Sequence, residues 1–337
     1  MIRFDYARAG DVAEAVRGGA GDHAAFLAGG TNLIDLMKEH VARPLQVIDI
    51  NPLPLREIRE TAEGGLLLGA LVSNADTAHD PRVQERYPLL ASAILAGASP
   101  QLRNAATNGG NINQRTRCYY FYDIDTPCNK RDPGSGCGAI GGRNRIHAIL
   151  GTSAQCIATH PSDMCIALAA LEARVHVTGP AGQRVIPFAD YHRLPGEEPW
   201  RDNNLAQGEL VTGIELPAEG FASNHSYLKL RDRLSYAFAL VSVAAALKIE
   251  EGRTVTARVA LGGVAHKPWR RSEAEALLEG EVPSEERFAA VADLLLEGAT
   301  GQGDNDFKVE LARRAIVRAL RQAAAGTPQS QTDKRIA

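Results

Sequence analysis

The sequence predicts an α+β fold built from three successive parts. The first is a small strand-helix-strand unit, in which the apolar run 26–28 turns through a double glycine into a helical pattern. The second is a larger α+β unit, because helical periodicity returns after a long irregular segment. The third combines an antiparallel sheet with helices, since two apolar strand patterns flank Glu251-Gly252 and helical segments follow them.

The first unit is expected over residues 1–55. Asp11 followed by Glu14 is typical of a capping box that opens a short helix. Residues 32–40, NLIDLMKEH, place their apolar side chains three and four positions apart, which predicts a helix with one buried face. Residues 46–50, QVIDI, predict the returning strand. The order of these elements, strand, helix and strand, predicts a βαβ unit.

The second unit is expected over residues 56–222. A strand is predicted at 66–72 and an apolar helix at 87–99. Residues 115–156 are rich in Gly, Pro, Asp, Asn and Cys without periodicity, which indicates a long ordered insertion. A helix running into a strand follows at 164–179.

The third unit is expected over residues 223–326, with a flexible tail over 327–337. Its strand patterns come first and its helical patterns last. The predicted strands are 226–231, 236–250 and 254–265, and the predicted helices are 272–280, 284–298 and 307–325.

Composition excludes several classes of partner. The 337 residues are 45% hydrophobic and 23% charged, and the formal net charge is −3 without a cluster of Lys or Arg. Neither nucleic acid nor an anionic membrane is therefore an expected partner. No run of eighteen apolar residues occurs, and the N-terminus lacks the pattern of a secretory signal. We expect no export signal in this chain.

Two glycine-rich loops carry the first chemical signal. Residues 28–33, AGGTNL, and residues 101–114, QLRNAATNGGNINQ, each place a double glycine among hydroxyl and amide side chains. Glycine lets a backbone approach a ligand closely and turn its amide groups outward, and a helix N-terminus favours an anion such as pyrophosphate. Taken singly, the first loop could equally be a tight turn capped by Thr31, and the second would more often be a turn whose Asn side chains satisfy its backbone. Two matched loops favour a dinucleotide.

The cysteines carry the second signal. Cys118, Cys128, Cys137 and Cys156 are separated by nine, eight and eighteen residues around the irregular segment. Such clustering favours a metal or redox site over a disulfide framework. The spacing alone leaves an iron-sulfur cluster, a structural zinc and buried free thiols open. Cys165 lies in an apolar helical pattern and is expected to be a small core residue.

Four separated motifs resemble one protein family. AGGTNL, TNGGNIN, HPSDMCIALAALEA and YLKLRDRLSYAFALVSVAAAL occur in this order over nearly the whole chain. Together they resemble the FAD-binding subunits of the xanthine dehydrogenase and carbon monoxide dehydrogenase group of molybdenum hydroxylases. The insertion RTRCYYFYDIDTPCNKRDPGSGC resembles that of flavin subunits of bacterial periplasmic-type aldehyde oxidoreductases.

The resemblance implies a role for individual residues. Asp163 is expected near the ribityl or ring end of FAD, and Lys229 beside the flavin ring, where a positive charge would stabilise the reduced anionic form. Without the resemblance, Asp163 could be a helix cap and Lys229 a solvated strand lysine. The residues expected around the phosphates are Leu27, Ala28, Gly29, Gly30, Thr31, Asn32 and Leu33 in the first loop and Thr107, Gly110 and Asn111 in the second.

The resemblance also implies a second cofactor. Related flavin subunits with this loop carry a [4Fe-4S] cluster, so Cys118, Cys128, Cys137 and Cys156 are expected to ligate one and Cys165 is not. No catalytic residue is expected in this chain, because no paired carboxylates and no nucleophile-base pair emerge from the spacing.

The implied function is that of a relay in a larger enzyme. Aldehyde would be oxidised at a molybdopterin cofactor in a large subunit, and electrons would pass through a small [2Fe-2S] subunit and this chain to an external acceptor, in a heterotrimer. Assembly is expected in the cytoplasm, with export to the periplasm alongside a signal-bearing partner left open. Two alternatives are a free-standing flavin oxidoreductase and a zinc-stabilised, non-enzymatic interaction protein.

Overall fold

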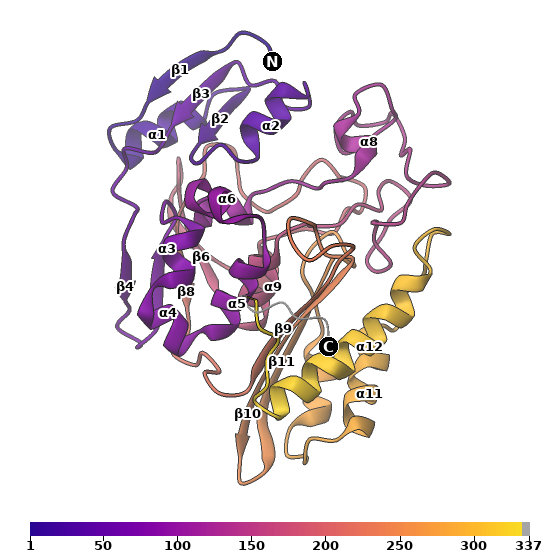
Figure 1. Cartoon of the computed structure of the whole chain (residues 1–337). Helices are drawn as coiled ribbons and strands as arrows, with labels where there is room; N and C mark the ends of the chain where they lie inside the picture. The colour runs from indigo at the N-terminus through magenta and orange to yellow at the C-terminus, as the bar shows by residue number, and fades with distance from the viewer. Residues whose placement is uncertain (332–337) are drawn as a thin grey trace.

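The computed structural model describes residues 1–331, which form three sheets with helices packed around them (Figure 1). This arrangement confirms the predicted α+β class. Among the helices of the described residues, none combines the length and hydrophobicity needed to cross a bilayer.

The first unit is a three-stranded parallel sheet in the order β1-β3-β2, with two helices. Asp11 caps the first helix by accepting from the Glu14 N–H (2.7 Å), as predicted. The return bond of the predicted capping box is displaced by one residue, because the Glu14 carboxylate accepts from the N–H of Gly10 (2.7 Å) and not of Asp11. Strand β1 was not predicted, because its four exposed residues show no alternation. The elements are β1 (Asp5–Arg8), α1 (Val12–Gly19), β2 (Ala24–Leu27), α2 (Leu33–Lys38) and β3 (Gln46–Asp49).

The second unit is a five-stranded antiparallel sheet in the order β4-β5-β8-β6-β7. Its strands are β4 (Ile58–Glu60), β5 (Leu66–Gly69), β6 (Arg174–Gly179), β7 (Gly182–Pro187) and β8 (Leu210–Leu216). Its helices are α3 (Asn74–His79), α4 (Pro81–Arg86), α5 (Pro88–Ala96), α6 (Pro100–Ala105), α7 (Asn108–Ile112), α8 (Tyr119–Tyr122), α9 (Asp163–Ala170) and the 3₁₀ helix η1 (Phe188–Asp190).

Proline sets the lengths of the helices in this unit. Pro81, Pro88 and Pro100 each occupy the first turn of a helix. Proline is tolerated in the first turn because the backbone N–H groups there have no intrahelical partner. The same proline could not continue the preceding helix, because it lacks the N–H that the interior of a helix requires. The chain between 74 and 112 is therefore a succession of short helices, and the second glycine loop leads into the last of them.

The third unit is a four-stranded antiparallel sheet in the order β12-β11-β10-β9, followed by helices. Glu251 and Gly252 both have positive φ (50° and 77°), as a two-residue hairpin turn requires, so the predicted hairpin is confirmed. The elements are β9 (His225–Leu230), β10 (Val241–Glu250), β11 (Arg253–Gly262), β12 (Trp269–Arg270), α10 (Ser272–Glu275), the 3₁₀ helix η2 (Ala276–Leu278), α11 (Glu285–Leu295) and α12 (Phe307–Ala324).

The end of the described chain lies against the third unit. The Thr327 N–H donates to the carbonyl oxygen of Gln322, and the Gln331 side-chain amide donates to that of Tyr227. Residues 332–337 of the tail predicted to be flexible lie outside the described residues.

Both faces of the third sheet are covered. On one face Ala244 and Ala246 of β10 join the core that includes residues of α5 and α9, and on the other Val243, Ala245 and Leu247 join the core formed with α11 and α12. Figure 1 shows α11 and α12 beside the long strands, with α5 and α9 across the sheet from them. Because side chains alternate along a strand, a strand buried on both faces is apolar throughout.

Burial in this sheet leads to a stability prediction. Leu261 of β11 is fully buried in the core against α11 and α12, whereas Val255 of the same strand is 44% exposed. Leu261→Ala should lower the free energy of unfolding by about 3 kcal/mol through lost burial and the cavity left behind. Val255→Ala, the matched control, should change it by less than about 0.5 kcal/mol. Urea unfolding of both variants measures the difference, and equal midpoints would contradict the packing described.

Candidate cofactor site between two glycine loops

Two cavities meet where the two glycine loops approach each other. One has a volume of about 340 Å³ and is walled mainly by apolar side chains of the first unit and of β8. The other, of about 860 Å³, extends toward α5, α9 and β9. The residues that line both cavities are Gly29, Gly30, Thr31, Asn32 and Gly110. An elongated ligand could therefore occupy both cavities, with its middle at the glycine loops.

Glycine is required in the first loop for two separate reasons. A Cβ atom on Gly29 would lie 1.8 Å from the carbonyl oxygen of Ala105, so the backbones of the two loops can touch only because Gly29 has no side chain. Gly30 has a φ of +72°, in the left-handed region that disfavours side chains. The double glycine thus sets both the contact between the loops and the direction of the chain.

The first loop presents hydrogen-bond donors that have no partner within residues 1–331. These are the backbone N–H groups of the four residues 29–32 and the buried side-chain nitrogen Nδ2 of Asn32. The amide oxygen of Asn32 accepts from the Arg115 N–H (3.0 Å), which orients its nitrogen. Buried donors normally have an acceptor, and converging backbone N–H groups favour an anion. These donors fit a diphosphate.

The second loop is held to the end of β5. The Thr107 hydroxyl caps α7 by accepting from the Gly110 N–H (3.2 Å), and the Gly109 N–H donates to the carbonyl oxygen of Ala70 (2.8 Å). Asn111 lies in a hydrogen-bonded chain, with its amide oxygen accepting from the Ser162 hydroxyl (2.6 Å). Part of this loop therefore satisfies its own backbone, as the turn interpretation expected, while Gly110 stays open to both cavities.

Asp163 and Lys229 form a buried ion pair in the wall of the larger cavity. Lys229 Nζ lies 2.7 Å from one carboxylate oxygen of Asp163, and the Tyr227 hydroxyl donates to the other (2.7 Å). Lys229 is 6% exposed, so it is not a solvated strand lysine, and Ser162 rather than Asp163 is the cap of α9. Each side chain gives the other a partner of opposite charge, which offsets part of the cost of burying them.

Comparison with known proteins identifies the family. Residues 2–219 match the family model of the FAD binding domain in molybdopterin dehydrogenase, and residues 225–323 match that of the CO dehydrogenase flavoprotein C-terminal domain. The chain is 48% identical over 327 residues to the aldehyde oxidoreductase FAD-binding subunit PaoB of Escherichia coli, covering 96% of this chain and 99% of that protein. This chain is a FAD-binding subunit of the molybdenum hydroxylase family.

More distant relatives of this flavin subunit share its fold. The carbon monoxide dehydrogenase medium chain of Hydrogenophaga pseudoflava is 32% identical over 335 residues, covering 95% of this chain and 97% of that one. The structure of that carbon monoxide dehydrogenase aligns with a TM-score of 0.75 at 30% identity over 97% of this chain and 99% of its own. Quinoline 2-oxidoreductase of Pseudomonas putida 86 aligns with a TM-score of 0.73 at 26% identity over 97% and 98%.

The cavities of the flavin subunit contain nearly all the residues expected from the resemblance. Leu27 is the exception: it ends β2, its carbonyl oxygen accepts from the Ile50 N–H, and it does not line either cavity. The expected residues that line at least one of the two cavities are Ala28, Gly29, Gly30, Thr31, Asn32, Leu33, Thr107, Gly110, Asn111, Asp163 and Lys229.

The larger cavity has further walls that the motifs did not single out. Arg103, Arg117 and Arg233 bring positive charge to it, and Tyr236 and Phe238 bring exposed aromatic rings. Asp35, Lys38 and Asp232 line the same cavity, and Arg117 is paired with Asp35, so the arginines add positive charge to a lining of mixed sign. Arg103 lies within the second glycine motif, and both aromatic residues lie within the motif of the third unit. No spacing rule predicted that these side chains would line the cofactor cavity.

The four loop cysteines line one small cavity. Its walls include Cys118, Cys128, Cys137 and Cys156, and Cys165 is not among them. The backbones of Cys128 and Cys137 pair in an isolated bridge, which explains how residues nine positions apart converge. Burial raises the pKa of Cys118 to about 12 and that of Cys156 to about 11, so these thiols are protonated until a metal displaces the proton.

Residues 115–118 border both the cysteine cavity and the two larger cavities. Arg115 lines the smaller glycine-loop cavity and Arg117 the larger one. Thr116 and Cys118, between and beside them, line the cysteine cavity. These four consecutive residues therefore form a wall shared by the cysteine cavity and the glycine-loop cavities.

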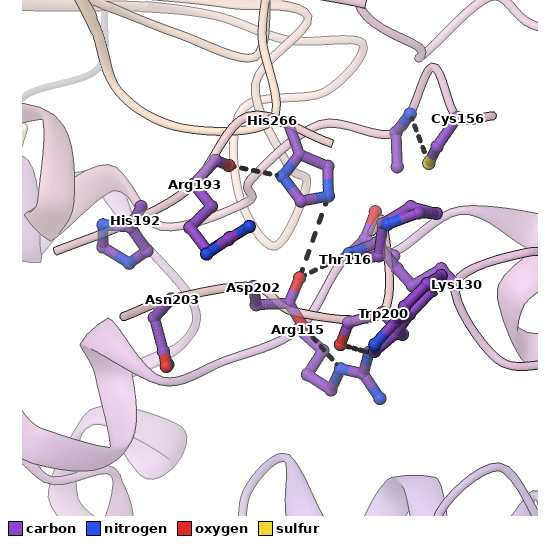
Figure 2. A network of polar contacts seen from close by, with 12 residues as sticks. Arg115, Thr116, Lys130, Cys156, His192, Arg193, Trp200, Asp202, Asn203 and His266 are labelled. Carbon is purple, nitrogen blue, oxygen red and sulfur yellow. Dashed lines mark hydrogen bonds and ion pairs between the residues drawn. The ribbon is translucent and has the colours of Figure 1, made fainter. Parts of the chain in front are cut away.

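Asp202 anchors the cysteine loop. Its carboxylate accepts from Lys130 Nζ (2.5 Å) and from Arg115 Nε (2.6 Å), and Figure 2 shows it between Arg115 and His266. Burial alone would raise the pKa of Asp202, but the charges of Lys130 and Arg115 hold it well below its usual range. Lys130 is itself buried and also donates to the carbonyl oxygen of Pro199 (2.7 Å).

The open side of Gly110 leads to a prediction about flavin binding. A Cβ there would meet only the Thr107 hydroxyl within 4 Å, at 3.0 Å, and the backbone angle is ordinary. Gly110→Val should therefore fold normally yet lose bound flavin, because its methyl groups enter the shared cavity space. Gly10→Ala, at a glycine outside both cavities, is the control and should keep full flavin. Flavin-to-protein absorbance ratios and thermal unfolding separate the two effects, and full flavin in Gly110→Val would contradict the assignment.

The histidine beside Asp202 predicts a pH dependence of stability. Burial, followed by the charge of Lys130, lowers the pKa of His266 to about 4. A histidine in the unfolded chain binds a proton below about pH 6.5, so stability falls as the pH drops from about 6.5 toward 4, by up to on the order of 3 kcal/mol for this group. His266→Phe should flatten this part of the curve, measured by urea unfolding at several pH values. His79→Gln, at an exposed site, should leave the slope unchanged.

Proposed function

We propose that this flavin subunit carries FAD and a [4Fe-4S] cluster and relays electrons from aldehyde oxidation, performed in a molybdenum subunit, to an external acceptor. The observation that carries the proposal is the wall formed by residues 115–118. Arg115 and Arg117 line the glycine-loop cavities while Thr116 and Cys118 line the cysteine cavity, so groups bound on the two sides of this segment would be neighbours. Adjacent redox groups are what a relay needs.

The two cavities suggest how FAD lies in the site. The diphosphate would accept from the unpartnered donors of the first loop. The adenosine half suits the smaller, largely apolar cavity, while the flavin half suits the larger one with Lys229, Asp163 and the aromatic rings. Bound FAD supplies hydride and single-electron chemistry. The protein's part is to orient it and place the positive charge of the nearby arginines at the ring end.

The spacing of the sulfur atoms favours an iron-sulfur cluster over zinc. A tetrahedral zinc with Zn–S bonds of about 2.3 Å would hold its sulfurs about 3.8 Å apart. Within residues 1–331, the group of three or more ligand atoms lying within 4.8 Å of one another does not include any of the four loop cysteines. A wider, soft-ligand cage suits a cluster of several iron atoms.

The assembly and its partners follow from the relatives. Escherichia coli PaoB is named as the FAD-binding subunit of an aldehyde oxidoreductase, and the Hydrogenophaga protein as the medium chain of a carbon monoxide dehydrogenase. We propose a heterotrimer with a molybdopterin subunit and a [2Fe-2S] subunit, assembled in the cytoplasm and open to export with a signal-bearing partner. Tyr119, Ile124 and Ile140 expose apolar side chains on the cysteine loop, a surface suited to a partner.

The cluster assignment predicts a pattern of iron content. Cys118→Ser, Cys128→Ser, Cys137→Ser and Cys156→Ser should each lower iron and sulfide in anaerobically purified protein, since each removes one of four ligands. Cys165→Ala is the control: Cys165 is fully buried away from the cysteine cavity and should leave iron unchanged. Zinc in place of iron in the wild-type chain would reject the cluster and favour the scaffold alternative.

The relay assignment predicts dependence on partners. The isolated chain should release FAD on acid denaturation and should not couple aldehyde oxidation to dye reduction. The complex with molybdenum and [2Fe-2S] subunits should couple aldehyde oxidation to dye reduction. Dye reduction assays on both preparations make the measurement, and aldehyde-dependent activity of the isolated chain would revive the free-standing oxidoreductase.

A further inference from the structure

Three side chains outside the flavin and cysteine sites converge in the interior. One ring nitrogen of His160, one of His192 and the sulfur of Cys165 all lie within 4.8 Å of one another. His160 and Cys165 flank the start of α9, while His192 follows η1, so two separate segments meet here. No spacing pattern predicts this group, because its histidines are thirty-two residues apart.

The hydrogen bonds of His192 leave one nitrogen free to ligate. Its Nε2 lies 2.8 Å from the carbonyl oxygen of Ile112, and because a carbonyl can only accept, Nε2 carries the proton. Its Nδ1 therefore holds a lone pair, and it is buried without a partner. A metal-binding histidine characteristically donates its other N–H to such a carbonyl, which fixes the ring and its tautomer.

The other two groups lie next to each other in the interior. His160 Nε2 lies 3.3 Å from Cys165 Sγ. Cys165 is fully buried, and His160 and His192 are 7% and 3% exposed, so a cation held by the three side chains would be shielded from water.

We propose that His160, Cys165 and His192 form a binding site for one soft monovalent cation, Cu⁺. On binding, the S–H bond of Cys165 breaks, a Cu–S bond forms, the proton leaves to solvent and copper keeps its oxidation state. Thiolate and imidazole are ligands that Cu⁺ accepts. The site then carries no net charge, whereas Zn²⁺ would leave one positive charge in the interior and would seek a fourth ligand.

The ion would join two parts of the flavin subunit. His160 and Cys165 bracket Ser162 and Asp163, which line the larger cavity. His192 precedes the segment that supplies Asp202, the anchor of the cysteine loop. The site is distinct from the proposed cofactor sites, since none of its three ligands lines the cysteine cavity or either glycine-loop cavity.

Anaerobic titration of the purified chain with Cu⁺, in competition with a coloured Cu⁺ chelator, tests the proposal. The wild type should bind one more equivalent than Cys165→Ser, whatever the loop cysteines bind. His192→Phe and His192→Gln should weaken that equivalent by more than the roughly 10- to 100-fold that loss of an outer hydrogen bond to a ligand costs. X-ray absorption of this equivalent should show one sulfur and two nitrogen neighbours.

The matched control is His225→Phe, since His225 is buried with an unpartnered Nδ1 but lies apart in β9. It should leave the copper stoichiometry unchanged. Thermal unfolding without metal tests whether each variant folds. If His192→Phe does not fold, His192→Gln still tests the proposal. Equal stoichiometry in wild type and Cys165→Ser, an all-sulfur environment, or tighter binding of Zn²⁺ than of Cu⁺ at this group would overturn the proposal.

Discussion

The carboxylate of Asp202 is the point on which the arrangement of the cysteine loop depends. It lies partly buried against Arg115 and the fully buried Lys130, which reach it from the beginning of the loop and from within it. Such a set contributes little net stability, but the loss of Asp202 would leave the buried charge of Lys130 uncompensated, which is strongly destabilising. The loop has one short helix and a small apolar cluster around Phe121, so the ion pairs add to a limited hydrophobic core.

Each of the three units contributes to one composite site. The first provides unpartnered donors, the second provides the glycine loop that touches Gly29, and the third provides Lys229, which reaches Asp163 of α9. The third sheet is fixed for this role because helices of the second unit cover one of its faces. The core between the units and the wall of the cofactor site are therefore parts of one packing arrangement.

The sequence predicted the local features well, because each of them depends on a few neighbouring residues. The capping box at Asp11, the hairpin at Glu251-Gly252 and both glycine loops were readable from neighbouring residues. Features that depend on residues far apart in the sequence could not be predicted in this way. Strand β1 has no alternation, the pairing of Asp163 with Lys229 joins residues far apart in sequence, and Asp202 lies in a segment of no marked pattern. No spacing rule anticipates which buried charges meet once the sheets have packed.

The wall between the cavities has a register as well as a composition. Arg115 and Arg117 line the glycine-loop cavities and Thr116 and Cys118 the cysteine cavity, so consecutive residues serve different sites. Removing or adding a single residue here would shift the residues that follow and move Cys118 away from the other three thiols. This tetrapeptide should therefore accept substitutions far more readily than changes of length, and homologous loops that vary in size should absorb that variation elsewhere.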